Sequence, residues 1–185
     1  MKRALEVCGP PEPRERAPGY ATLVRTIIDQ QVSVQAGASI WRKLEEGVVD
    51  ISPEGVSRAG ADKLRSCGLS RPKARYALCL AEAIIDRSLD LDGLDGLTDK
   101  DVMKALTSVT GIGRWTAEIY LMFALGRDDI WPGGDVALAA SAERLMKLER
   151  RPTISELDEV AERWRPWRTT AALVLWHYYK RAPLG

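Results

Sequence analysis

The feature that most constrains the fold is a pair of glycines, Gly111 and Gly113, between two segments with helical spacing of apolar residues. Apolar residues three and four positions apart share one helical face before the glycines and another after them: Val102, Ala105, Leu106 and Val109, then Ala117, Tyr120, Leu121 and Ala124. Glycine takes positive φ without a side-chain clash, so the turn can point successive N–H groups outward beside the positive end of the second helix dipole. The pattern predicts a hairpin of two helices, whose turn is either a simple glycine cap or a phosphate-binding corner.

Composition predicts an all-α fold. The 185 residues can bury one good core or two small helical lobes, and 45% of them are hydrophobic. Helix formers such as Ala, Leu, Arg and Glu dominate, and no long alternating segment of β-branched and aromatic residues occurs in the sequence.

The charge distribution and the cysteine content indicate which binding partners and which cellular compartment to expect for the protein. The net charge of +1 is a weak argument for nucleic acid, but residues 163–181 carry five Arg and Lys and no acid. No apolar run approaches the roughly 20 residues that a membrane span needs, and the N-terminus has no apolar signal-peptide core. The three cysteines are too few and too widely spaced for a disulfide framework, a zinc site or an iron–sulfur cluster. We therefore expect a reducing, cytoplasmic compartment and no membrane partner.

Helix start and stop signals punctuate the rest of the chain. We expect residues 1–18 to be an extended or loosely ordered arm, and the Asp- and Gly-rich segment 89–97 to be a linker. Ser52-Pro53 and Gly60 are expected to open two short helices, the second stopped by Gly68. Further helices are predicted over 20–31, 34–46, 70–87, 100–109, the segment after Gly113, 135–148, 155–164 and 167–181. The apolar stripe of the first of these is expected to be Leu23, Val24, Ile27 and Ile28, and Ser70 and Thr98 are expected to cap the helices that follow them.

Asp135 stands directly after a Trp-Pro-Gly-Gly segment and directly before an apolar run. Aspartate is among the most favoured N-cap residues, so capping is the simpler interpretation of Asp135. A carboxylate held at a helix start could also face a sugar, where its charge would stabilise positive charge as a glycosidic bond breaks or would activate water. The single histidine, His177, has no nucleophile and acid to match it and is interpreted as a structural partner.

Aromatic residues are unusually distributed, with six Trp and five Tyr but one Phe. Most of these rings are expected to pack in cores. Trp115 is the exception, because it follows the glycine turn directly and could stack on a base.

Four segments, in order, carry a resemblance to a known family. Residues 27–34 (Ile-Ile-Asp-Gln-Gln-Val-Ser-Val), 68–75 (Gly-Leu-Ser-Arg-Pro-Lys-Ala-Arg), 106–117 and 164–176 together resemble the helix-hairpin-helix DNA glycosylases, most closely the 3-methyladenine DNA glycosylase II type. The resemblance spans most of residues 20–180.

The resemblance implies a two-lobed helical glycosylase fold with duplex DNA across the cleft and the helix-hairpin-helix motif at about 101–126. We expect residues 1–185 to form one compact unit, with one lobe over about 20–97 and a second over about 98–181 that includes the arm 1–19. The implied activity is hydrolysis of the N-glycosidic bond of alkylated purines, such as 3-methyladenine and 7-methylguanine, in base excision repair.

The resemblance also implies roles for individual residues. Asp135 matches the catalytic carboxylate, and Gln31 matches the residue that fills the gap left in the duplex. The base pocket is expected to include Trp115, Trp176, Ile119 and Trp131, with Ile119 standing where relatives often have Tyr. Phosphate is expected on the amides of Gly111, Gly113 and Thr116. No cofactor is required, although similar hairpins hold a monovalent or divalent cation on carbonyls equivalent to those of Thr107, Val109 and Ile112.

Bifunctional members of the family, which also cut the strand, carry a Lys where this chain has Trp115. The resemblance therefore implies a monofunctional enzyme that leaves an abasic site, acting as a monomer on damaged duplex DNA in the nucleoid. Two alternatives stay open. One is a non-catalytic module that binds damaged DNA, with Asp135 only a cap; the other is a glycosylase for oxidised, deaminated or mismatched bases.

Overall fold

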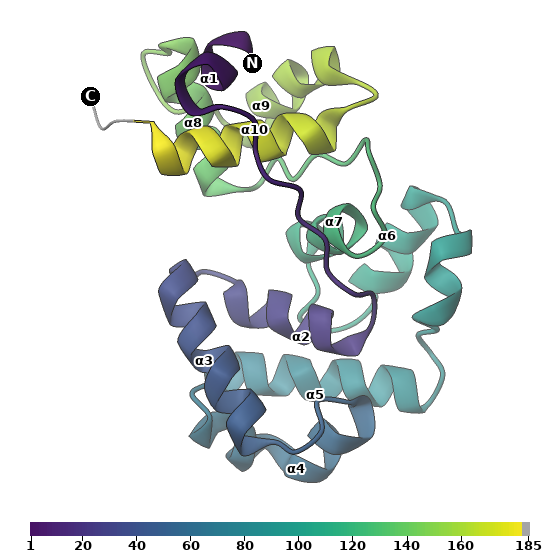
Figure 1. Cartoon of the computed structure of the whole chain (residues 1–185). Coiled ribbons are helices and arrows are strands. Elements are labelled where there is room, and N and C mark those ends of the chain that lie inside the picture. Colours follow the sequence, from purple (N-terminus) through teal and green to yellow (C-terminus); the bar gives the residue numbers. More distant parts are fainter. Residues whose placement is uncertain (183–185) are drawn as a thin grey trace. The chain divides into compact units, whose positions relative to one another are not determined.

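The computed structural model describes residues 1–182, and this part of the chain is all-helical, without a strand (Figure 1). The predicted fold class is confirmed. The α-helices are α1 (Lys2–Cys8), α2 (Tyr20–Asp29), α3 (Val34–Gly47), α4 (Pro53–Ser66), α5 (Arg71–Ile85), α6 (Asp99–Thr107), α7 (Arg114–Phe123), α8 (Val136–Met146), α9 (Ile154–Ala161) and α10 (Arg168–Arg181). Two 3₁₀ helices, η1 (Asp92–Gly96) and η2 (Glu162–Trp164), join them.

Side-chain caps explain where many of these helices begin. The residue before each of α3, α4, α5, α6, α8 and α9 accepts a hydrogen bond from a backbone N–H of the first turn: Ser33, Ser52, Ser70, Thr98, Asp135 and Thr153. Such a bond satisfies an N–H that has no partner within the helix. The N-caps predicted at Ser52, Ser70, Thr98 and Asp135 are therefore confirmed.

The chain divides into two compact units. One, which we call the hairpin unit, is Arg16–Leu125; the other, the terminal unit, combines Met1–Glu15 with the chain from Gly126 onward. The division falls after the α6–α7 hairpin, whereas the boundary expected from the sequence lies before the hairpin, near residue 97. The reason is that α7 packs against α2, so the hairpin shares a core with the helices that precede it.

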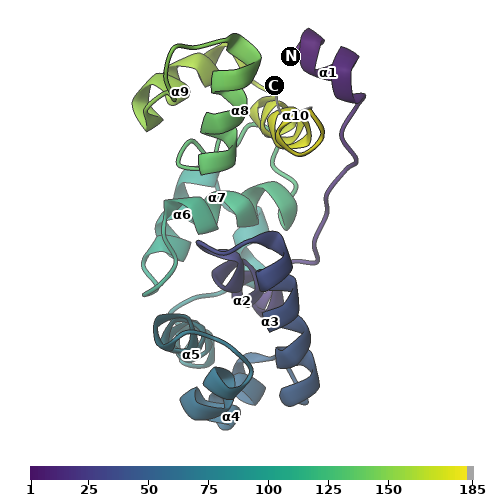
Figure 2. The ribbon, with the colours of Figure 1, turned by 90° about the vertical axis from the view of Figure 1, so that its left-hand side faces the viewer.

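Within the hairpin unit, α2 packs against α3, α5 and α7, while α4 packs along α5 and α6 along α7. Figures 1 and 2 show α5 between α2 and α4. The predicted apolar stripe of α2 is fully buried: Leu23, Val24, Ile27 and Ile28. Gly60, with φ 73° and ψ 172°, breaks α4 into the two short helical pieces that were predicted.

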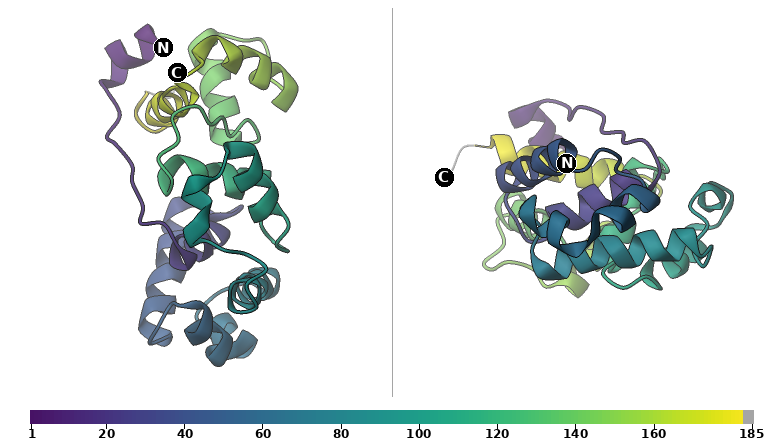
Figure 3. Two further views of the ribbon diagram at one scale, coloured as in Figure 1. Left: turned by 90° about the vertical axis from the view of Figure 1, so that its right-hand side faces the viewer. Right: turned by 90° about the horizontal axis from the view of Figure 1, so that it is seen from below.

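Within the terminal unit, α10 packs against both α1 and α8 (Figures 2 and 3). The expectation of a loosely ordered arm is wrong for residues 2–8, which form α1. Ala4 is buried, and the ring N–H of His177 Nε2 donates to the Cys8 carbonyl oxygen at 2.9 Å. Packing on α10 thus orders a segment that shows no strong helix signal of its own, and His177 is a structural partner.

The segment 89–97 is more ordered than a linker, because Leu94 within η1 is buried. Cys8, Cys67 and Cys79 are free thiols. Over the residues that the structure describes, every helix is too short or too polar to traverse a lipid bilayer.

Candidate functional site

The hairpin turn between α6 and α7 depends on Gly111. Its φ is +96°, in the region that favours glycine, and a Cβ added there would overlap the Cβ and Cγ of Tyr76 on α5. The first glycine of the motif is therefore fixed both by backbone conformation and by the close approach of a neighbouring helix.

Gly113 has a different role. It is the N-cap of α7 with an ordinary φ of −89°, and an added Cβ would meet nothing within 4 Å. The hydrogen-bond ladder of α7 starts with the Ala117 N–H, which donates to the Gly113 carbonyl at 3.1 Å. The amides of Gly113 to Thr116 precede this ladder at the positive end of the helix dipole. The glycine leaves the approach to them open, a geometry that suits an anion.

Thr116 and Gly111 share a partner, Gln30, whose role the sequence does not reveal. Gln30 Nε2 donates to the Gly111 carbonyl at 3.1 Å and to Thr116 Oγ1 at 2.9 Å. The buried side chain of Thr116 therefore faces the end of α2, while its main chain belongs to the first turn of α7. The signal for Gln30 in the sequence is its place beside Gln31 in the Gln-Gln-Val-Ser segment.

Gln31, the residue expected to enter the duplex, is exposed and has a left-handed φ of 53°. Lys73 Nζ donates to the carbonyl of Ile28 at 2.8 Å and to that of Gln30 at 2.7 Å, on the chain just before it. Burial lowers the pKa of Lys73, and the charge of Asp29 opposes that shift. Lys73 lies in the segment 68–75 that carries the family resemblance, but its two partners are 45 and 43 positions away and leave no local signal in the sequence.

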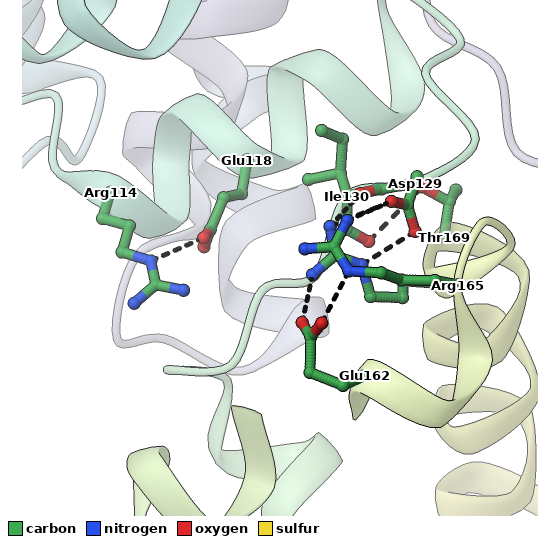
Figure 4. Close-up of polar contacts among 8 residues, drawn as sticks. Arg114, Glu118, Asp129, Ile130, Glu162, Arg165 and Thr169 are labelled. Atoms are coloured by element: carbon green, nitrogen blue, oxygen red, sulfur yellow. Dashed lines mark hydrogen bonds and ion pairs between the residues drawn. The ribbon is translucent and has the colours of Figure 1, made fainter. Parts of the chain in front are cut away.

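Two residues expected in the base pocket lie on α7. Trp115 is half-buried at the second position of the helix, and Ile119 is buried one turn later. Glu118, between them in sequence, is also buried and pairs with the exposed Arg114 at 2.7 Å (Figure 4). A buried carboxylate on α7 thus has its charge compensated by a guanidinium from the same helix.

Asp135 caps α8 and is held from two directions. Its Oδ1 accepts hydrogen bonds from the Ala137 N–H at 2.9 Å and the Leu138 N–H at 3.0 Å. The same oxygen accepts a third bond, at 3.0 Å, from the indole Nε1–H of Trp176 on α10. One carboxylate oxygen is therefore fixed by a helix end and by a side chain 41 residues away. The structure brings these two sequence-predicted site residues into direct contact.

Trp131, also expected in the pocket, is buried in the terminal unit, where it packs against Trp164. The ring centroids are 5.3 Å apart with the planes tilted by 55°. A tilted arrangement at this distance is a favourable aromatic pair. Trp131 thus helps to form the core next to the segment that leads to Asp135.

An ion-pair network anchors that same segment (Figure 4). Asp129 pairs with Arg165 at 2.7 Å and Arg168 at 2.8 Å, and Glu162 pairs with the same two arginines. Burial raises the pKa of Asp129, but the hydrogen bonds and charges of the arginines outweigh it and lower the pKa. Thr169 adds a bond to the Ile130 N–H at 3.1 Å. The loop before α8 is therefore fastened to the start of α10.

The carbonyls proposed for a cation lie at the end of α6 and in the turn. The Val109 carbonyl accepts the Ile112 N–H at 3.1 Å, which leaves its second lone pair for a ligand. The carbonyl of Thr107 belongs to the last turn of α6, where carbonyls have no intrahelical donor. Side chains offer no alternative in the described part of the chain, which holds no group of three His, Cys, Asp or Glu suited to a metal.

The sequence of this chain is similar to those of known DNA repair proteins. Residues 24–166 match the family model for "HhH-GPD superfamily base excision DNA repair protein". In Schizosaccharomyces pombe, the alkylbase DNA glycosidase-like protein mag2 is 30% identical over 171 residues, covering 90% of this chain and 80% of that protein. DNA-3-methyladenine glycosylase 1 of the same organism is 29% identical, covering 98% of this chain and 82% of that protein.

Solved structures show the same similarity. The S. pombe 3-methyladenine DNA glycosylase Mag1 in complex with abasic DNA matches with a TM-score of 0.88 and 28% identity, covering 100% of this chain and 93% of that one. A DNA-3-methyladenine glycosidase from Bacillus halodurans matches with a TM-score of 0.76 and 32% identity, covering 96% and 83% of the two chains.

Proposed function

Because the chain belongs to the HhH-GPD superfamily of base excision DNA repair proteins, we propose that it is a DNA glycosylase for alkylated purines in duplex DNA. It hydrolyses the N-glycosidic bond of bases such as 3-methyladenine and 7-methylguanine and leaves an abasic site. Two relatives that align with most of this chain are named as an alkylbase DNA glycosidase-like protein and a DNA-3-methyladenine glycosylase. The observation that carries the proposal is the fixed carboxylate of Asp135.

The reaction requires little acid catalysis from the protein. A purine alkylated on its ring already carries positive charge and leaves readily, while the sugar develops oxocarbenium character. Asp135 supplies a negative charge for that sugar and can orient the attacking water. Its Oδ1 is fixed by two amides and an indole, so the charge needs no reorganisation as the bond breaks.

The hairpin unit supplies the grip on DNA. A backbone phosphate lies on the amides of Gly111, Gly113 and Thr116, and Gln31 enters the base stack where the damaged nucleotide has left. A cation on the carbonyls of the hairpin turn would add positive charge beside that phosphate. Trp115 offers an electron-rich ring to a cationic base.

The reaction ends at the abasic site because position 115 carries Trp, which has no amine to form a Schiff base with the sugar. Strand cutting therefore requires added alkali. A panel of alkylated, deaminated and oxidised duplexes, assayed with and without alkali, tests both the base range and this hydrolytic outcome.

The decisive variant is Asp135→Asn. Asparagine keeps an oxygen for the three hydrogen bonds and is as good an N-cap as aspartate, so stability should stay within about 0.5 kcal/mol. Loss of the charge should slow release of 7-methylguanine by roughly 10²- to 10³-fold, the scale of losing one preorganised electrostatic contact. Duplex binding should be retained.

Glu149→Gln is the matched control, because Glu149 is exposed in the same unit and the change removes the same charge. It should leave base release unchanged. Normal release by Asp135→Asn would refute the catalytic assignment. Wild-type protein that binds damaged DNA yet releases no base from any duplex of the panel would favour the non-catalytic module.

A further inference from the structure

The turn between α2 and α3 combines an exposed tip with a tightly bonded base. Residues 31–36 are all exposed, and they include the apolar side chains of Val32 and Val34. At the start of the tip, Gln31 has a φ of 53°, a conformation that costs a non-glycine residue energy and persists only where neighbours enforce it. The structure around Gln31 should therefore contain the groups that enforce it.

Lys73 is one of these groups. Its ammonium donates to two carbonyls at the C-terminal end of α2, those of Ile28 and Gln30, at 2.8 and 2.7 Å. Carbonyls in the last turn of a helix have no intrahelical donor, and the negative end of the helix dipole favours a cation there. The half-buried ammonium holds the main chain up to the residue before Gln31. Its lowered pKa is a sign of the desolvation that these bonds must offset.

Gln30 is the other group. While its carbonyl is held by Lys73, its side-chain amide donates to the Gly111 carbonyl and to Thr116 Oγ1. These acceptors are the first residue of the glycine turn and the third residue of α7. One residue thus connects the α2–α3 turn to both sides of the phosphate-binding corner, across 81 and 86 positions of sequence.

The crossing of α2 and α3 behind the tip is also fixed. Gly37 in α3 lies so close to Asp29 at the end of α2 that an added Cβ would overlap the carboxylate oxygen. That carboxylate is held in turn by Arg25 at 3.3 Å and Arg16 at 3.5 Å. The two residues that flank the tip, Asp29 and Gly37, are therefore held close together.

We propose that Gln30 and Lys73 are positioning residues that hold Gln31 at a set place relative to the Gly111–Thr116 turn. Gripping a phosphate on that turn then directs Gln31 into the base stack as part of the same rigid body. The inference rests on the proposed function for its setting, a glycosylase that extrudes a base. A pre-built wedge removes the cost of ordering the turn during binding.

The main variants are Gln30→Met and Lys73→Met, which keep side-chain length and remove the donors. Base release is measured in single turnover on two duplexes, one with 7-methylguanine opposite cytosine and one with it opposite an abasic analogue. The second duplex has no partner base to displace, so extrusion depends less on the wedge. We expect both variants to lose roughly 10²-fold on the paired duplex, the scale of a misplaced group, and at most about threefold on the unpaired one.

Two control variants are measured on the same duplexes. Gln31→Gly removes the wedge itself and should give the same split between the two duplexes. Lys63→Met removes one exposed positive charge from α4 of the same unit and should leave both rates unchanged. Equal losses on the two duplexes, or no loss on either, by variants whose melting temperatures are near that of the wild type would overturn the positioning role.

A readout without catalysis separates this inference from the proposed function. 2-Aminopurine placed next to an abasic analogue brightens when the stack is opened, whether or not any base is released. Brightening with wild-type protein that falls in Gln30→Met and Lys73→Met supports the positioning role even if no glycosylase activity is found. Brightening that is unchanged in both variants overturns it even if the enzyme is active.

The salt dependence of binding tests the other interpretation of Lys73, direct contact with a phosphate. A positioning residue should leave the slope of log K against log salt unchanged. A slope reduced by about one in Lys73→Met, and unchanged in Lys63→Met, would assign the ammonium to the DNA backbone and overturn the proposal.

Discussion

Replacement of Gly111 by alanine should destabilise the protein, by an amount that the structure allows us to work out. Alanine at a φ of +96° pays a backbone penalty of about 1–2 kcal/mol. Its Cβ would overlap Tyr76, and forcing extra carbon into a packed site costs about 1–3 kcal/mol more. Alanine also restricts the unfolded chain, which stabilises the folded protein by about 0.4–1 kcal/mol and offsets part of these costs. The free energy of unfolding should therefore fall by about 1–5 kcal/mol.

Urea denaturation of the variant and of Gly113→Ala measures this difference. Position 113 has an ordinary φ and open space around an added Cβ, so neither of these costs applies there. Alanine is a poorer N-cap than glycine by about 0.5–1 kcal/mol, which reduced freedom of the unfolded chain offsets by about 0.4–1 kcal/mol, so stability should change by no more than about 0.5 kcal/mol. The contrast between two glycines two residues apart removes general effects of Gly→Ala replacement. A Gly111→Ala protein within about 0.5 kcal/mol of the wild type would refute the reasoning.

Second-site variants test the overlap itself. The added Cβ conflicts with the Cβ of Tyr76 as well as with its ring, so Tyr76→Ala should not rescue Gly111→Ala. Tyr76→Gly removes the Cβ and the ring, so it should recover the stability lost to the overlap. A glycine inside α5 costs about 1 kcal/mol in turn, which reduces the recovery by that amount. Rescue by Tyr76→Ala would show that the ring alone causes the conflict.

Two further predictions concern the terminal unit. Trp176→Phe removes the indole donor to Asp135 and should lower kcat about tenfold with little change in KM, the equivalent of about 1.4 kcal/mol of transition-state stabilisation; steady-state kinetics with an unchanged kcat would contradict it. The hydrogen bond from Arg150 is the main cause that lowers the pKa of Glu156 from 4.5 to about 2, so its contribution to stability should be complete above pH 4.5 and lost as the pH falls toward 2. Glu156→Gln should flatten that part of the stability profile while Glu149→Gln leaves it, and parallel profiles would argue against the pair.

The sequence predicted the elements of this fold well because their signals are local. The apolar stripe of α2, the caps at Ser70 and Thr98 and the glycine hairpin each depend on residues a few positions apart. Helix α1 was missed because Ala4 and the contact with α10 order it, and neither leaves a local pattern.

The candidate site was predictable residue by residue but not in its connections. Asp135 was recognised both as a cap and as a candidate carboxylate, yet its bond to Trp176 joins residues on different helices. In the same way, the partners of Gln30 and Lys73 lie more than 40 positions away. Such contacts follow from the packing of helices, which periodicity and spacing do not determine.

The packing of α1 on α10 has a consequence for biosynthesis. The terminal unit joins the two ends of the described chain, whereas the hairpin unit is one continuous stretch, Arg16–Leu125. During translation the continuous stretch leaves the ribosome complete while α8 to α10 are still to be made, so it can collapse first. Residues 2–8 then have no packing partner until α10 emerges from the ribosome. Helix α10 then provides the surface on which α1 packs, and the carboxylate of Asp135 gains its third hydrogen bond only when Trp176 has been synthesised.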